Sequence, residues 1–202
     1  KPSLLTFNEV TTFLHEFGHA LHGMFSKCTY GSTSMDGVSR DFVELPSQFM
    51  ENFALEKEWL DTWAVHYQTG EKIPQEYIDK IKKSSNFQAG YASDRQLSFG
   101  MVDMAWHTIT EPVTEPLVDF EQRAMGKTEI MPLVKGSAFS PAFGHIFAGG
   151  YAAGYYGYKW AEVLDADAFS LFKQNGIFDK TTAESFRRNV LEKGESENPM
   201  TL

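Results

Sequence analysis

The sequence predicts a mainly α-helical fold, and three observations carry this prediction. Apolar residues recur at three- and four-residue spacing through most of the chain. Strand-like alternation is sparse, and glycine and proline clusters separate the helical segments. The chain has 202 residues, of which 42% are hydrophobic and 14% aromatic. This is enough apolar material for one domain with a sizeable core.

The first two predicted helices cover the N-terminal third of the chain. One runs from Phe7 to Phe25 and starts near Thr6 or Asn8. A polar connection over residues 26–39 follows it. The second helix is expected from Phe42 or Leu45 to about Trp63, because the proline at position 46 is tolerated in a first turn.

The rest of the chain alternates between helices and turns. Further helices are predicted over residues 76–84, 88–111, 119–126, 159–175 and 182–192, with a loop over 131–143. No internal repeat and no linker interrupts this pattern, so we expect residues 1–202 to form one portion of a single domain.

Charge and cysteine content exclude several classes of protein. The net charge of -9 and the absence of a Lys/Arg block argue against nucleic-acid binding. No apolar run reaches membrane-span length. The single cysteine, Cys28, excludes an internal disulfide and a cysteine-based zinc site. We expect a cytoplasmic location; a periplasmic one stays open, because the chain does not begin with methionine.

A metal-binding pattern lies in the first predicted helix, where residues 15–19 read His-Glu-Phe-Gly-His. Residues four apart on a helix are separated by about 40° around the axis and about 6 Å along it, so both imidazoles can reach one ion. Glu16 lies beside such an ion and can act as general base. Two solvated histidines are the alternative. The apolar neighbours Phe13 and Phe17 indicate a buried helix and disfavour it.

A catalytic zinc site requires a third protein ligand. His22 shares the face of His15 but lies about 10.5 Å further along the helix, too far to bind the same ion. It therefore supports a ligand or packs in the core. Glu44, at the start of the second helix, is the better candidate, and Asp41 remains its rival.

Two polar residues follow Glu44 on the same helix face. Gln48 and Glu51 lie four and seven positions beyond it. Such residues commonly accept a hydrogen bond from the free ring N–H of a ligand histidine. An ordinary polar face is an equally good interpretation.

A glycine- and tyrosine-rich segment follows His145. Its glycines are Gly149, Gly150, Gly154 and Gly157, and its tyrosines are Tyr151, Tyr155, Tyr156 and Tyr158. Glycine permits positive φ and close backbone approach. Tyrosine keeps its proton near neutral pH and can donate a hydrogen bond to an oxyanion. The alternative is a packing segment with half-buried rings.

Three separated motifs together resemble one family. They are His15-Glu-Phe-Gly-His-Ala-Leu-His22, Arg40-Asp-Phe-Val-Glu-Leu-Pro-Ser-Gln48 and Phe143-Gly-His-Ile-Phe-Ala-Gly-Gly-Tyr-Ala-Ala-Gly-Tyr-Tyr-Gly-Tyr158. In this order they resemble the thimet oligopeptidase family of zinc peptidases, over nearly the whole chain. The resemblance implies a helical zincin-type catalytic domain with the HExxH helix near the N-terminus of this chain.

The resemblance also implies residue roles. His15, His19 and Glu44 match the family's zinc ligands, which favours Glu44 over Asp41 and implies one zinc ion per chain. Glu16 matches its catalytic base. His145, Tyr151 and Tyr158 match family residues that contact substrate and stabilise the reacting carbonyl. Tyr155 lies in the same segment and has a less defined role.

The implied activity is hydrolysis of short peptides. Within the family the resemblance is greatest to dipeptidyl carboxypeptidases, which release C-terminal dipeptides, and an oligopeptidase A-like endopeptidase is the alternative. A catalytically silent zinc-binding module and a metal-free helical interaction domain are the non-enzyme alternatives.

Family members are several hundred residues longer than this chain. The resemblance therefore implies a C-terminal portion of the catalytic domain without the N-terminal half. We expect such a piece to fold and bind zinc but to show little peptidase activity alone. We also expect it to expose an apolar surface or to cover that surface with a second copy.

Overall fold

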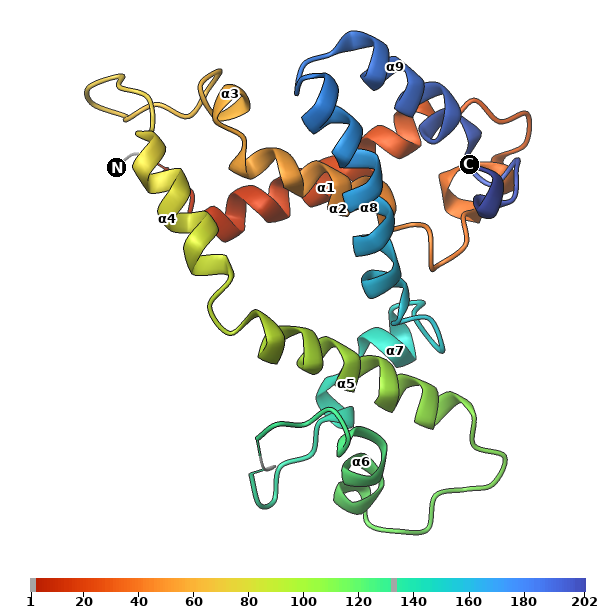
Figure 1. The fold of residues 1–202 in the computed structure, drawn as a ribbon. Helices are drawn as coiled ribbons and strands as arrows, with labels where there is room; N and C mark the ends of the chain where they lie inside the picture. Colours follow the sequence, from red (N-terminus) through yellow and green to blue (C-terminus); the bar gives the residue numbers. More distant parts are fainter. Residues whose placement is uncertain (1–2, 132–133) are drawn as a thin grey trace. The chain divides into compact units, whose positions relative to one another are not determined.

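The computed structural model describes residues 3–131 and 134–202. Among these residues only one isolated β-bridge, between Val65 and Lys72, departs from helices, turns and loops. The α-helices are α1 Phe7–Phe25, α2 Leu45–Glu51, α3 Lys57–Leu60, α4 Gln75–Ser85, α5 Ala89–His107, α6 Leu117–Met125, α7 His145–Ala148, α8 Gly157–Asn175 and α9 Lys180–Asn189 (Figure 1). The predicted mainly α-helical fold is confirmed.

The chain divides into two compact units. Residues 1–85 and 160–202 form the first unit, and residues 86–159 form the second. None of the helices in the described ranges is long and apolar enough to cross a membrane.

Helix α1 has the bounds that its sequence predicts, Phe7–Phe25. Thr6 caps its N-terminus: the Glu9 amide donates to the Thr6 hydroxyl at 3.3 Å, and the Thr6 amide donates to the Glu9 carboxylate at 2.7 Å. This reciprocal capping box satisfies two amides that have no partner within the helix.

The second predicted helix is wrong as one continuous element. The segment divides into α2, a 3-10 helix over Asn52–Leu55, and α3. The Asn52 side-chain amide donates to the carbonyls of Gln48 and Phe49 at 3.2 and 3.3 Å, and so competes for groups that a continuing helix would use. Glu56 is extended, with φ -94 and ψ 118, and separates the 3-10 helix from α3.

Other boundaries differ by a few residues. Helix α5 ends at His107 and not near 111, and α8 begins at Gly157. Helix α9 begins at Lys180, because the Asp179 side chain accepts the Thr182 amide hydrogen bond at 2.7 Å. The predicted loop over 131–143 contains a 3-10 helix, Ser140–Ala142, and its residues 132–133 lie outside the described ranges.

The core of the first unit is largely aromatic. Phe49 in α2 packs against Phe169 and Phe172 in α8, with ring centroids 5.7 and 5.1 Å apart. Phe53 and Ile177 complete this cluster. Because α2 follows Glu44 directly, these contacts fix the position of that carboxylate.

Helices α1 and α2 lie side by side (Figure 1). The approach is close at Gly18, where an added Cβ would lie 2.4 Å from the Pro46 carbonyl oxygen and 2.6 Å from the Ser47 Cα. Only glycine fits there. The buried residues of α1, namely Leu14, Gly18 and His22, are four positions apart and form the face that packs on α2.

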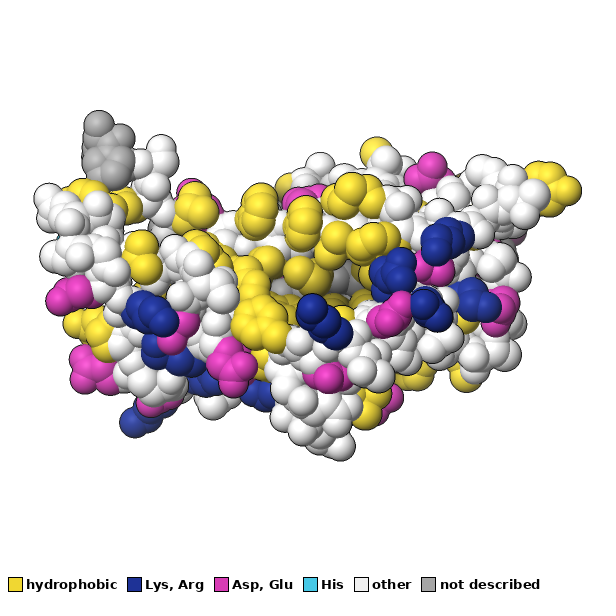
Figure 2. Space-filling view, turned by 90° about the horizontal axis from the view of Figure 1, so that it is seen from above, with side chains coloured by type: hydrophobic (Ala, Val, Ile, Leu, Met, Phe, Trp, Pro, Cys, Tyr) yellow, Lys and Arg dark blue, Asp and Glu magenta, His cyan; other side chains and the backbone are white. Residues whose placement is uncertain are grey.

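The opposite side of α1 contradicts the expected burial of the whole helix. The side chains of Phe13 and Phe17 are 63% and 40% exposed, and Met24 is 66% exposed. The Phe13 and Phe17 rings stack on each other with centroids 6.0 Å apart. Hydrophobic side chains also gather on the surface seen in Figure 2. Helix α1 therefore buries one face, which carries Leu14, Gly18 and His22, and leaves Phe13, Phe17 and Met24 exposed.

The second unit has its own core around α5 and α6. Val102, Phe120, Met125 and Ile146 are buried there. Trp106 packs on Phe120 with ring centroids 4.2 Å apart. This unit carries the glycine- and tyrosine-rich segment.

Candidate metal centre

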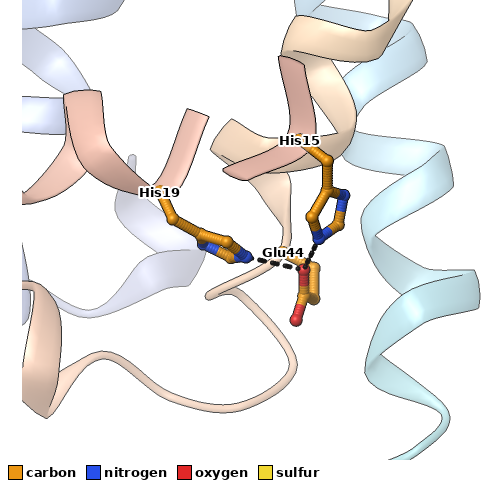
Figure 3. A group of neighbouring side chains, drawn as sticks. All are labelled: His15, His19 and Glu44. Atoms are coloured by element: carbon orange, nitrogen blue, oxygen red, sulfur yellow. Dashed lines mark ion pairs between the residues drawn. The ribbon is translucent and has the colours of Figure 1, made fainter. Parts of the chain in front are cut away.

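Three side chains converge at the junction of α1 and α2 (Figure 3). The Nε2 atoms of His15 and His19 each lie 3.2 Å from the same Glu44 oxygen, Oε2. The potential ligand atoms of the three residues all lie within 4.8 Å of one another. This is the trio that the sequence analysis proposes as metal ligands.

The distances from Glu44 Oε2 to the two histidine nitrogens fit a zinc ion. Tetrahedral zinc with bonds of about 2.0–2.1 Å to nitrogen and oxygen separates its ligand atoms by about 3.3 Å. The observed 3.2 Å separations match this value. Glu44 is also 1% exposed. A buried carboxylate needs compensating partners, and Ser47 supplies one by donating its hydroxyl to Oε2 at 2.8 Å.

The ring of His15 is held from its other side by Glu51. Its Nδ1 lies 2.7 Å from Glu51 Oε1, which leaves Nε2 directed at Glu44. Hydrogen bonds with Glu44 and then Glu51 raise the pKa of His15 to about 9. A carboxylate that accepts from Nδ1 is the usual support for an Nε2 metal ligand. The contact supports the first of the two interpretations of Glu51.

The other polar residues near the trio have different surroundings. Gln48 is half-buried, and within the described ranges its Oε1 has no hydrogen-bond partner. His22 is fully buried, and burial followed by the charge of His19 lowers its pKa to about 4. A neutral, fully buried ring favours packing for His22. Asp41 is not part of the trio and lines a surface cavity with Ser39 and Trp160.

Glu16 is exposed on α1, one residue after His15. Water therefore reaches its carboxylate freely. Its position on the helix, about 100° from His15, keeps it beside the trio and outside it.

The second unit brings the aromatic candidates together. His145 Nε2 lies 3.0 Å from the Tyr158 hydroxyl. The Tyr151 ring stacks on His145 and on Tyr158, with centroids 4.9 and 5.1 Å apart. Tyr155 donates its hydroxyl to Gln96 Oε1 at 3.0 Å, and burial raises its pKa.

Asp103, which lies beside this segment, was not predicted as a functional residue from the sequence. It is fully buried in α5 and accepts hydrogen bonds from the backbone of residues 153 and 155. The signal was its place in the apolar run Gly100-Met-Val-Asp-Met-Ala105, since a carboxylate there must find partners.

Comparison with known proteins gives consistent matches over the whole chain. The description "Peptidase family M3" matches residues 1–202. Oligopeptidase A of Escherichia coli (strain K12) is 46% identical over 208 residues, covering 100% of this chain and 30% of the relative. Organellar oligopeptidase A, chloroplastic/mitochondrial, of Arabidopsis thaliana is 47% identical over 208 residues, covering 100% of this chain and 26% of the relative.

A second group of relatives is less similar. Dipeptidyl carboxypeptidase of Salmonella typhimurium is 38% identical over 204 residues, covering 100% of this chain and 30% of the relative. The chain therefore spans about 30% of the length of these curated relatives.

Proposed function

Because the chain belongs to peptidase family M3, we propose that the protein containing it is a zinc metallopeptidase that hydrolyses short peptides. The observation that carries this proposal is the trio of His15, His19 and Glu44, with Glu16 exposed beside it. A structural metal site has no use for a carboxylate next to its first ligand. Glu16 therefore favours an enzyme over a silent zinc-binding module.

The residues of the first unit would have different roles in such a site. His15, His19 and Glu44 would hold the ion, and Glu51 would orient His15. A zinc ion there supplies Lewis-acid chemistry, polarising a carbonyl and lowering the pKa of water. Glu16 accepts a proton from the attacking water and later passes it to the leaving amine.

The second unit would supply hydrogen-bond donors to the substrate. The hydroxyls of Tyr151 and Tyr158 can donate to the oxyanion that develops on the scissile carbonyl. His145, in contact with Tyr158, can contact the substrate or orient that hydroxyl. The clustering of these three side chains supports the assignment.

The cleavage mode is the finer part of the proposal. The motifs predict release of C-terminal dipeptides, whereas identity is higher to oligopeptidase A, at 46%, than to dipeptidyl carboxypeptidase, at 38%. We favour oligopeptidase-type cleavage of short peptides for this reason. Mapping the products from a blocked tripeptide and from a longer peptide distinguishes the two, because only dipeptide release shortens every substrate by two residues from its C-terminus.

Metal analysis and peptidase assays of the full protein test the function. We expect one zinc ion per chain in protein prepared without chelator, and its loss in His15→Ala. Glu16→Gln should retain zinc and bind peptide but lose turnover, because an amide cannot accept the proton from water.

The same measurements on the wild type and on these variants distinguish the peptidase from the two non-enzyme alternatives. Absence of stoichiometric metal in the wild type would favour the metal-free interaction domain. Near-normal turnover in Glu16→Gln would refute the base assignment. Zinc with no turnover on any short peptide would favour the silent module.

A further inference from the structure

A fully buried carboxylate organises the tyrosine-rich segment. Asp103 in α5 is 0% exposed. Its Oδ1 accepts a hydrogen bond from the Ala153 amide, and its Oδ2 accepts one from the Tyr155 amide, both at 2.9 Å. His107 Nδ1 lies 2.8 Å from Oδ1 as well. Both carboxylate oxygens thus bond backbone donors, which compensates for burial of the charge.

The backbone that Asp103 holds is strained. Ala153 has φ 54, in the left-handed region, although it carries a Cβ. Such a conformation is unfavourable for a residue other than glycine, because its Cβ crowds the neighbouring backbone. Gly150 also has positive φ, at 81, and a Cβ on Gly149 would lie 2.7 Å from the His145 carbonyl oxygen. The segment therefore needs outside contacts to keep this shape.

The conformation decides where the aromatic donors lie. Tyr151 precedes the held residues by two positions, and Tyr158 follows them by three. Two backbone hydrogen bonds connect these tyrosines to the held residues. The Gly154 amide donates to the Tyr151 carbonyl at 2.9 Å, and the Tyr158 amide donates to the Tyr155 carbonyl at 3.3 Å. A change at residues 153–155 would move both hydroxyls relative to His145.

We propose that Asp103 is a positioning residue for the peptidase reaction, and this inference rests on the proposed function. It touches neither substrate nor metal ligand. It fixes the backbone of residues 153–155, and through it the directions of the Tyr151 and Tyr158 hydroxyls. The carboxylate thus acts on the rate of the reaction through the tyrosines and leaves the metal site unchanged.

The same unit contains a matched control. Glu121 in α6 is also 0% exposed and accepts two backbone amides, those of Phe139 at 2.8 Å and Ser140 at 2.6 Å. It holds the segment around the 3-10 helix and not residues 153–155. Loss of its charge should destabilise the unit in the same way as loss of the Asp103 charge, without reorienting the tyrosine backbone.

The test compares Asp103→Asn with Glu121→Gln in the full, zinc-loaded protein. An asparagine of the same size has one acceptor in place of two and directs its NH2 at the other amide. For Asp103→Asn we expect kcat to fall about 100-fold with KM and zinc content little changed, the signature of misplaced transition-state donors. Glu121→Gln should lower the melting temperature similarly and change kcat by less than about threefold.

A combined variant tests whether Asp103 acts through the two tyrosines. In a protein that already carries Tyr151→Phe and Tyr158→Phe, adding Asp103→Asn should lower kcat by far less than Asp103→Asn does alone, because both hydroxyls that it positions are already gone. Independent factors that multiply would overturn the proposal, as would equal kcat losses in Asp103→Asn and Glu121→Gln.

Two further measurements keep the proposal testable if Asp103→Asn folds poorly or the wild type shows no peptidase activity. Ala153→Val leaves Asp103 intact but strains the backbone at positive φ, and should likewise lower kcat with KM unchanged. Amide hydrogen exchange at residues 153 and 155 should accelerate about tenfold or more in Asp103→Asn and not in Glu121→Gln. Unchanged exchange at both amides would refute the role of Asp103 whether or not the peptidase assignment stands.

Discussion

The residue scale is governed by which atoms each polar side chain contacts. His15 uses Nδ1 for Glu51 and directs Nε2 at Glu44, so its two nitrogens have separate tasks. His22, one turn beyond His19, differs because it is fully buried. Identical side chains on one helix thus acquire different chemistry from the surface that each faces.

One residue-scale prediction concerns the tyrosine hydroxyls. Tyr158→Phe or Tyr151→Phe in the full protein should lower kcat by about 10- to 1000-fold, roughly the effect of removing one oxyanion donor. Steady-state kinetics on a short peptide provides the measurement. A rise confined to KM would indicate uniform substrate binding, and unchanged kinetics in both variants would return the segment to a packing role.

A second residue-scale prediction concerns Asp165 in α8. It is 8% exposed and accepts the Asn52 side-chain amide at 3.1 Å. Burial, together with the nearby charges of Glu162 and Glu51, raises its pKa to about 6 despite that hydrogen bond. The unfolded chain has an aspartate pKa of about 3.9, so the folded state binds more protons between about pH 4 and 6. Stability therefore falls as pH rises through this window.

Asp165→Asn should remove this fall in stability with rising pH. We expect it to raise the free energy of unfolding at pH 7, by at most about 3 kcal/mol. Urea unfolding from pH 4.5 to 7.5, with chelator present so that both forms are metal-free, measures the difference. Asp167→Asn, an exposed neighbour on the same helix, provides the control. An unchanged pH slope in Asp165→Asn would contradict the assignment.

At the scale of elements, the metal trio depends on how closely α1 and α2 approach. His15 and His19 belong to α1, whereas Glu44 directly precedes α2. The aromatic core holds α2 against α8, and Gly18 permits the contact with α1. The site is therefore a product of helix packing as much as of its ligand residues.

Gly18→Ala tests this dependence. Its Cβ would meet the Pro46 backbone at 2.4 Å, so the helices must separate. We expect a loss of about 1–3 kcal/mol of stability and a weaker zinc affinity, measured by chelator competition. Gly23→Ala in the same helix meets only the Met35 sulfur at 3.5 Å and should be neutral or slightly stabilising. Equal zinc affinity in both variants would show that the close approach is not needed.

At the scale of the molecule, the chain covers about 30% of the length of its relatives. The exposed rings of Phe13 and Phe17 on the metal-site helix fit a surface that further polypeptide covers. Positioning a substrate can contribute about 7–11 kcal/mol toward lowering a barrier. With less polypeptide around the site to contact the substrate, this contribution would be much smaller.

We therefore expect the 202-residue chain to bind zinc yet hydrolyse peptides far more slowly than the full protein. Zinc analysis and kcat/KM for both, on the same peptide, provide the measurement. Comparable kcat/KM values would mean that this chain alone contains the whole active site. Failure to bind zinc would mean that the trio needs the rest of the protein.

Sequence alone determined the features that depend on local periodicity and local chemistry. The helical class, the bounds of α1 and the family were predicted from repeating apolar positions and three motifs, because helix formation and motif spacing are short-range properties. The sequence also indicated His15, His19 and Glu44 as the metal ligands. Only the resemblance to the family favoured Glu44 over Asp41.

Tertiary structure decided what depends on distant partners. The break of the second predicted helix follows from the Asn52 side chain, and Phe13 is exposed because it lies outside the face of α1 that packs on α2. Long-range contacts also reveal that Glu51 supports His15 and that Asp103 bonds the backbone 50 residues away. From the sequence, an aspartate in an apolar run can be predicted only to need hydrogen-bond donors. Which donors it contacts is decided by the tertiary structure.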